Sequence, residues 1–152
     1  MLQTFKTFVI VSQQFPINVN LPKHLIWEKR EPYTYIRRTF EPRIMIGGLD
    51  ERGRRLRDKD ASKNREKLIE AAGRLMKDAE KDIRAEFSYA ALFGESKDNL
   101  PYMGPDPDMR NVFILCGLGG NGTVYSAIGS DIVVEWMEDL TLEDAELFRI
   151  NR

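Results

Sequence analysis

The sequence predicts an α+β fold: a mixed, mostly antiparallel sheet with one long packed helix, followed by a C-terminal strand, glycine turn and helix. Three observations support this class. Short runs of β-branched and aromatic residues recur through the first two thirds of the chain. The stretch from Asp60 to about Asp78 carries apolar residues at helical spacing. Near the C-terminus, an apolar run leads into four glycines within six residues and then a second helical pattern.

Composition bounds the class of protein. The 152 residues suffice for one domain with a core, and the formal net charge of −1 predicts no strong attraction to nucleic acid or to a membrane surface. No apolar stretch is long enough to cross a bilayer, and the N-terminus lacks the features of a signal peptide. Cys116 is the single cysteine, so no internal disulfide can form, and we expect a cytoplasmic protein. His24 is the single histidine, and we expect no metal site.

The N-terminal third predicts strands joined by loops. Phe5–Ser12 is expected to form a strand, Phe15–Pro22 a surface loop with two prolines, and Leu25–Trp27 a short second strand. Tyr33–Thr39 and Ile44–Ile46 flank the turn Phe40–Arg43 and predict a β-hairpin.

The hairpin carries the first candidate site residues. Tyr33, Tyr35 and Arg37 share one face of a regular strand. They form either a packed sheet face or the wall of a substrate pocket. Gly47-Gly48 is expected to break or bulge the second strand.

The middle of the chain predicts a charged loop and then a helix. Asp50–Asp60 mixes acidic and basic residues and is expected to be a solvated loop. Asp60 or Ser62 can cap the helix that runs to about Asp78.

A strand and a long loop are expected next. In Ile83–Leu92, the alternation places Ile83, Ala85, Phe87 and Tyr89 on one side of a half-exposed strand. Phe93–Pro107, with two glycines and three prolines, predicts a long irregular loop near the glycine turn.

The segment Val112–Met137 reads as one strand–turn–helix unit. Val112–Cys116 suits a buried strand, and glycines follow at 117, 119, 120 and 122. Glycines allow positive φ values and close approach of a ligand, and the N–H groups at the start of the helix favour an electron-rich group. On these residues alone, a ligand cradle and a plain glycine-rich connection remain equal alternatives.

Four segments together resemble the C-terminal part of the D-amino-acid-oxidase-like FAD-dependent oxidoreductases, the glycine oxidase and amine dehydrogenase types among them. The loop FGESKDNLPYMGPDP resembles the family's T-x-D-G-L-P-x-I-G loop, and CGLGGNG resembles its G-x-G-G-x-G turn. The hairpin ending in GGLDE and the closing ELFRINR are also similar to the family.

The resemblance implies a cofactor, FAD, and residues that contact it. By position, these are Leu118, Gly119, Gly120, Asn121, Gly122 and Thr123. It implies a substrate-domain-like region at residues 1–110 and a flavin-contacting region at 111–152, packed as one unit. Backbone N–H groups of the turn would stabilise negative charge on the reduced flavin. No general base is nominated.

Two departures from the family qualify this assignment. Nothing ahead of the hairpin resembles the strand and G-x-G-x-x-G that hold the cofactor diphosphate, so we expect a missing N-terminal FAD-binding half or a partner chain. Where family members place a carboxylate-binding arginine, this chain has Phe93-Gly94-Glu95, which argues against a carboxylate substrate and leaves an amine or another small substrate open.

Three functions remain open. The chain is part of an amine- or amino-acid-oxidising enzyme that is inactive without its other half, an accessory subunit that completes a flavin site, or an interaction module without flavin. Since the Val112–Cys116 strand has no evident partner, a homodimer is also open.

Overall fold

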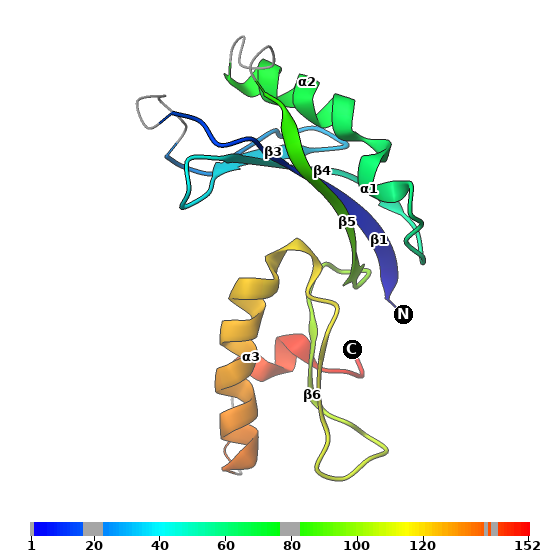
Figure 1. The fold of residues 1–152 in the computed structure, drawn as a ribbon. Coiled ribbons are helices and arrows are strands. Elements are labelled where there is room, and N and C mark those ends of the chain that lie inside the picture. The colour runs from blue at the N-terminus through cyan, green and yellow to red at the C-terminus, as the bar shows by residue number, and fades with distance from the viewer. Residues whose placement is uncertain (1, 17–22, 77–82, 139, 141–142) are drawn as a thin grey trace. The chain divides into compact units, whose positions relative to one another are not determined.

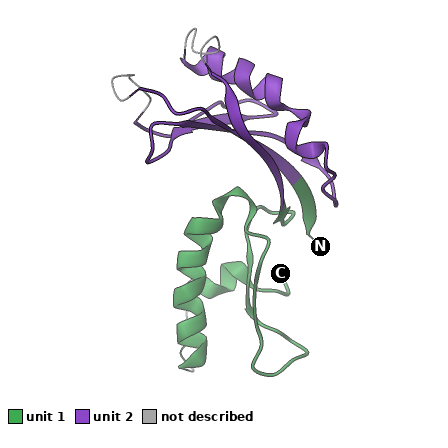
Figure 2. Cartoon of the chain, in the orientation of Figure 1, with its two compact units in different colours: residues 1–5, 93–152 green, residues 6–92 purple. Residues whose placement is uncertain are grey.

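The computed structural model describes residues 2–16, 23–76, 83–138, 140 and 143–152. The chain divides into two compact units (Figure 2). One unit is Lys6–Leu92, and the other combines Met1–Phe5 with Phe93–Arg152. The functional boundary expected between residues 110 and 111 stays a prediction. The α+β class is confirmed, and each unit is described separately below.

A five-stranded sheet dominates the first unit, in the order β2-β3-β4-β1-β5. The strands are β1 (Gln3–Ser12), β2 (Ile26–Trp27), β3 (Thr34–Arg38), β4 (Ile44–Arg52) and β5 (Ala85–Glu95). The predicted hairpin is confirmed: β3 and β4 pair antiparallel, with Ile36 opposite Ile46. β2 also pairs antiparallel with β3. The predicted loop at Phe15–Pro22 falls mostly outside the described residues.

Two helices, α1 (Asp60–Lys63) and α2 (Arg65–Met76), follow β4, and α2 covers one face of the sheet (Figure 1). Leu68, Ala71 and Ala72 lie at helical spacing on its buried side. The sheet contributes the other half of this core, chiefly Phe8, Ile10, Ile36, Ile44 and Ile46. The predicted single helix is therefore interrupted at Asn64, and its last predicted residues, 77 and 78, lie outside the described residues.

β4 does not break at its two glycines. It continues to Arg52 because glycine makes room for β3 at both positions. A Cβ on Gly47 would lie 2.4 Å from the Tyr35 hydroxyl oxygen. Gly48 has φ +118°, and a Cβ there would lie 2.3 Å from the Tyr33 carbonyl oxygen. Gly48 thus preserves pairing that a side chain would disrupt, and Gly47 leaves room for the end of the Tyr35 side chain.

The charged stretch Asp50–Asp60 is not wholly a solvated loop, because both of its ends are structured. Its first residues belong to β4, and the Asp60 side chain is fully buried. Lys6 Nζ, itself buried, donates to Asp60 Oδ2 over 2.8 Å, and the Arg57 N–H donates to the same oxygen. The hydrogen bond from Lys6 lowers the pKa of Asp60. Asp60 therefore links β1 to the start of α1 instead of capping a helix.

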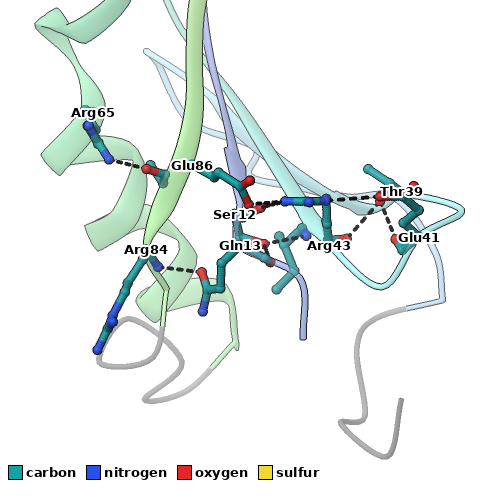
Figure 3. A network of polar contacts seen from close by, with 10 residues as sticks. Ser12, Gln13, Thr39, Glu41, Arg43, Arg65, Arg84 and Glu86 are labelled. Carbon is teal, nitrogen blue, oxygen red and sulfur yellow. Dashed lines mark hydrogen bonds and ion pairs between the residues drawn. The ribbon is translucent and has the colours of Figure 1, made fainter. Parts of the chain in front are cut away.

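Arg43 fastens one end of the sheet (Figure 3). Its guanidinium donates to the Ser12 carbonyl oxygen over 2.9 Å and to Glu86, while Ser12 Oγ accepts from the Ile44 N–H. Beside it, the Gln13 and Arg84 backbones are hydrogen bonded. These bonds join β1, β4 and β5 far apart in sequence.

The alternation predicted for β5 holds only at its start. Ile83 and Ala85 are buried, but Phe87 and Tyr89, expected on the same side, are 53% and 43% exposed. β5 is the edge strand of this sheet, and the main contacts of α2 are with β3 and β4. Arg43 instead lies over the Phe87 ring, 5.6 Å from its centroid.

The second unit contains a two-stranded antiparallel sheet, β6 (Tyr102–Pro105) with β7 (Phe113–Cys116). A short 3₁₀ turn, Gly119–Asn121, precedes α3 (Gly122–Met137), and a second 3₁₀ segment covers Glu143–Phe148. The predicted irregular loop is wrong in part, since β5 extends to Glu95 and β6 lies within it. β6 thus supplies the pairing strand that the sequence alone did not identify for β7.

This unit has its own small core and a tail that holds a loop. Met103, Ile132 and Phe148 are buried together. Arg152 donates to Asp98 Oδ2 over 2.7 Å and to the Leu100 and Pro101 carbonyl oxygens. It also lies 4.2 Å from the Tyr102 ring centroid. The C-terminus thereby fixes the segment between β5 and β6.

Replacing Ile46 by alanine tests the core of the first unit. Ile46 is fully buried, so Ile46→Ala is expected to lower the free energy of unfolding by about 2–5 kcal/mol. Phe40→Ala, at a fully exposed ring, is the control and should change it by less than about 0.5 kcal/mol. Urea unfolding at constant m-value measures both. Equal midpoints for the two variants would contradict the burial of Ile46.

The Asp98–Arg152 contact predicts a pH dependence. The hydrogen bonds from Arg152 and Ser96 lower the pKa of Asp98 below its usual 3.8. A carboxylate with a lowered folded-state pKa contributes stability above its unfolded-state pKa, and this contribution is lost as the pH falls through the folded-state value. Acid urea titrations should therefore show a smaller loss in Asp98→Asn than in the wild type. Asp108→Asn, at an exposed side chain, should keep the wild-type profile.

Candidate functional site

The glycine turn between β7 and α3 is the centre of the candidate site. Gly117 and Gly119 have φ values of +73° and +55°, which L-residues with a side chain rarely adopt. A Cβ on Gly117 would also lie 2.8 Å from Leu2 Cδ2. These two glycines are therefore required by the fold of the turn itself.

Gly120 differs from both. It is exposed, its φ is not in the left-handed region, and a Cβ on it would meet nothing within 4 Å. Neither the backbone nor the packing of the described chain thus requires glycine there. The space beside Gly120 is open to a group from outside the unit.

The start of α3 presents backbone donors beside that space. The residue preceding α3, Asn121, makes no side-chain cap hydrogen bond. The first N–H groups of an α-helix have no partner within the helix, and the helix dipole adds a partial positive charge there. Gly122 and Thr123 begin α3, and no acidic residue occupies its first turn. The helix start is thus suited to an electron-rich ligand atom.

Glu95 and Cys116 border the turn. Glu95 pairs with Leu118 as an isolated antiparallel bridge, and a Cβ on Gly119 would lie 3.3 Å from Glu95 Oε1. Burial raises the pKa of the Cys116 thiol, which favours its neutral form. The sequence did not place an acid at this turn, because Glu95 reaches it through pairing over more than twenty residues.

The second group of candidate residues lies on the other unit, along β3. Thr34 and Ile36 are buried toward the core, whereas Tyr33 and Tyr35 are half-buried and Arg37 is exposed on the alternate face. Burial raises the pKa of both tyrosines, and the neighbouring Asp50 raises that of Tyr33 further. Both phenols are therefore neutral donors near neutral pH.

The turn residues 118–123 are brought together by the structure, as are Tyr33, Tyr35 and Arg37, each group within one unit. Asp50 and Glu95 are additional polar residues near these two groups that were not among the site residues predicted from the sequence. A signal for Asp50 existed, since it belongs to the GGLDE motif on the strand that pairs with β3.

Nowhere in the described residues do three or more histidine, cysteine or acidic side chains gather as a metal site would need. Among the helices of the same residues, none is long and apolar enough to span a membrane.

Comparison with known proteins identifies the family. The model of the family described as FAD dependent oxidoreductase, DAO, matches residues 1–136. No curated protein matches the chain at a significant level.

Solved structures share the fold. Glycine oxidase from Geobacillus kaustophilus superposes with a TM-score of 0.74 at 20% identity, over 93% of this chain and 36% of that one. Glycine oxidase from Bacillus cereus superposes with a TM-score of 0.70 at 19% identity, over 95% of this chain and 39% of that one. L-Proline dehydrogenase from P. horikoshii superposes with a TM-score of 0.65 at 16% identity, over 98% of this chain and 39% of that one. The chain thus spans well under half the length of these proteins. With most of its residues matched by the family model, the chain belongs to the DAO family of FAD-dependent oxidoreductases.

Proposed function

We propose that the chain is the C-terminal portion of an enzyme that oxidises a small amine or amino acid with FAD, and that it acts together with an N-terminal dinucleotide-binding half. The observation that carries this proposal is Gly120. Its backbone borders open space beside an uncapped helix start, in a segment that matches a flavoenzyme family. We place the enzyme in the cytoplasm.

The turn suits the flavin ring in shape and in charge. Backbone at Gly119, Gly120 and Asn121 would approach the ring closely, and N–H groups of Gly122 and Thr123 would face its electron-rich edge; Leu118 completes this contact set. Bound FAD supplies the acceptor for two electrons from the substrate. The donors at the start of α3 would stabilise negative charge on a bound flavin, and the Glu95 carboxylate beside Gly119 would oppose it.

The outer side of α3 supports a missing half. The helix has only two charged residues, Asp131 and Glu135, and no basic one. Val134 and Met137 are 51% and 74% exposed, although a helix of such composition is usually buried. A cavity of about 340 Å³ beside Phe113 and Trp136 adjoins its C-terminal end. We assign this side to the dinucleotide-binding half, because the solved relatives contain more than half their length beyond the matched region.

An amine is favoured over an amino acid by Phe93. The family resemblance places a carboxylate-binding arginine at this part of the chain. Here the Phe93 ring stacks on Phe5, with centroids 5.6 Å apart and planes 19° apart. The pair offers no cation to a substrate carboxylate. Tyr33, Tyr35 and Arg37 are the proposed pocket wall.

An accessory domain that binds no flavin alone is the second candidate. The broad apolar side of α3 favours it, since such a surface serves association whether or not flavin is bound. Flavin content that depends on this chain in the assembled halves supports the first function, and flavin content that is the same with and without this chain supports the second.

Gly120→Val tests the flavin contact. The chain would be co-expressed with the dinucleotide-binding half encoded with it, and flavin absorbance measured after desalting. We expect wild-type assembly to retain FAD and Gly120→Val to fall to background, because the added side chain occupies the open space. Ser126→Val, at an exposed position of α3, is the matched control and should retain flavin. Full occupancy in Gly120→Val would refute the contact.

Val134→Glu tests the α3 surface. A charge placed in an apolar interface should weaken association of the halves roughly tenfold or more, about 1.4 kcal/mol, while leaving the chain's own stability within about 0.5 kcal/mol. Titration calorimetry measures the affinity. Met109→Glu, which puts the same charge at an exposed apolar residue of the β6–β7 connection, is the control. If self-association of the chain, and not binding of the other half, responds to Val134→Glu, the surface belongs to a homodimer.

A further inference from the structure

The loop that joins β4 to α1, residues 52–59, is strongly basic, and we call it the arginine loop (Figure 1). It contains five basic residues and one acidic residue, although the whole chain has a formal net charge of −1. Since salt screens exposed charges beyond about 8 Å, distant acids do not cancel this local excess. Four of the basic side chains are exposed and form no ion pair in the part of the chain that the structure describes: Arg52, Arg54, Arg55 and Lys59.

The acids on either side of the arginine loop are neutralised by the protein itself. Glu51 forms ion pairs with two lysines, one of them Lys6 at 4.0 Å. Asp60 is buried, and its Oδ2 lies 2.8 Å from Lys6 Nζ, while Arg57 Nε lies 3.9 Å from its other oxygen. The mixed signs of the sequence therefore do not persist on the surface. Asp58 is the one acid among residues 52–59, all of which the structure describes.

The buried Lys6 side chain holds both ends of the arginine loop. At the start, a Cβ on Gly53 would lie 2.6 Å from Lys6 Cε, so glycine lets the backbone pass directly over the lysine. At the end, Lys6 donates to Asp60 Oδ2, which also accepts from the Arg57 N–H over 2.8 Å. Because the loop is anchored at two points, its exposed cations lose less conformational freedom on binding a partner than those of an unanchored loop.

The residue types of the arginine loop indicate the chemistry of its partner. Guanidinium groups form paired hydrogen bonds with phosphate oxygens. Leu56 lies among the arginines, and it is 45% exposed. A nucleic acid presents phosphates along its backbone with no apolar layer beneath them, whereas an anionic bilayer presents phosphates above hydrocarbon. Exposed arginines around an exposed leucine therefore fit the bilayer.

We propose that the arginine loop docks the protein on a membrane surface that contains anionic phospholipids. The guanidinium groups of Arg54 and Arg55 bind headgroup phosphates, and the Leu56 side chain enters the boundary between headgroups and acyl chains. Arg52 and Lys59 add attraction to the surface. Each basic residue near an anionic surface strengthens binding roughly fivefold, so the docking is reversible and depends on salt. It requires neither flavin nor substrate, and it goes beyond the proposed function.

The test is co-sedimentation with lipid vesicles, performed on the chain alone and on the chain co-expressed with the dinucleotide-binding half. One set of vesicles is phosphatidylcholine, and the other contains about one third phosphatidylserine. We expect both protein samples to bind the phosphatidylserine vesicles and not the phosphatidylcholine vesicles. Binding should be lost when the salt is raised from about 0.05 M to about 0.5 M, because the attraction is then screened.

A double substitution connects the binding to the arginines. Arg54→Gln with Arg55→Gln should weaken vesicle binding roughly tenfold or more. Lys29→Gln with Arg30→Gln removes the same charge from another exposed pair of the same unit and is the matched control. It should keep the affinity within about twofold of the wild type, since these residues lie outside the arginine loop. Equal urea midpoints verify that the variants remain folded.

Leu56→Ser tests the insertion of the leucine. It should weaken vesicle binding roughly fivefold or more, because the apolar side chain no longer leaves water. Leu25→Ser is the matched control, since Leu25 is 59% exposed and lies outside the arginine loop. It should bind like the wild type. The charge of the protein is the same in both variants, so this effect is separate from that of the arginines.

Equal binding to both kinds of vesicle, or unchanged affinity in the double arginine variant, would overturn the proposal. Tighter binding of polyglutamate or of duplex DNA, together with no effect of Leu56→Ser, would also overturn it, since the partner would then be a polyanion of another class. Vesicle binding by the chain alone but not by the assembled halves would show that the loop is covered in the enzyme, and would reject the docking. None of these outcomes depends on the flavin experiment.

Discussion

The hold of Arg152 on the segment between β5 and β6 is the interaction on which the glycine turn depends. Its guanidinium bonds the Asp98 carboxylate and two carbonyl oxygens, and Ser96 bonds the same carboxylate over 2.8 Å. Directly before Ser96, Glu95 pairs with Leu118 at the turn. The C-terminal residue therefore positions the turn through a chain of polar contacts, with little apolar burial involved.

This arrangement holds the glycine turn in place on a small unit. The core of the unit is limited to a few buried side chains around Met103 and Ile132, so packing alone would hold the turn weakly. Left-handed glycines at 117 and 119 fix the turn's path, and the polar contacts fix what lies beside it. The larger unit relies instead on a sheet with α2 packed across it, and there charged groups serve mainly to join distant strands.

Much of the fold could be predicted from local patterns. Alternation and helical spacing located β1, the β3–β4 hairpin, α2 and α3, because each depends on neighbours in sequence. The role of residues 118–123 in binding a cofactor stays a prediction. What could not be predicted depends on distant partners: β6 is a strand only because β7 pairs with it, and Asp60 is buried only because Lys6 reaches it. Asp50 and Glu95 were missed because their surroundings come from other strands.

Gly120 carries a consequence for mutational scanning. Gly117 and Gly119 have backbone conformations that residues with a side chain rarely adopt, so their substitution would reduce the amount of folded protein. Gly120 has no such requirement in the described structure, so under the proposed function its constraint would come from the flavin beside it. Cellular abundance and catalytic turnover, scored across all substitutions, would therefore diverge at this position more than at its neighbours. Such divergence separates residues that a chain keeps for its own folding from those it keeps for something else.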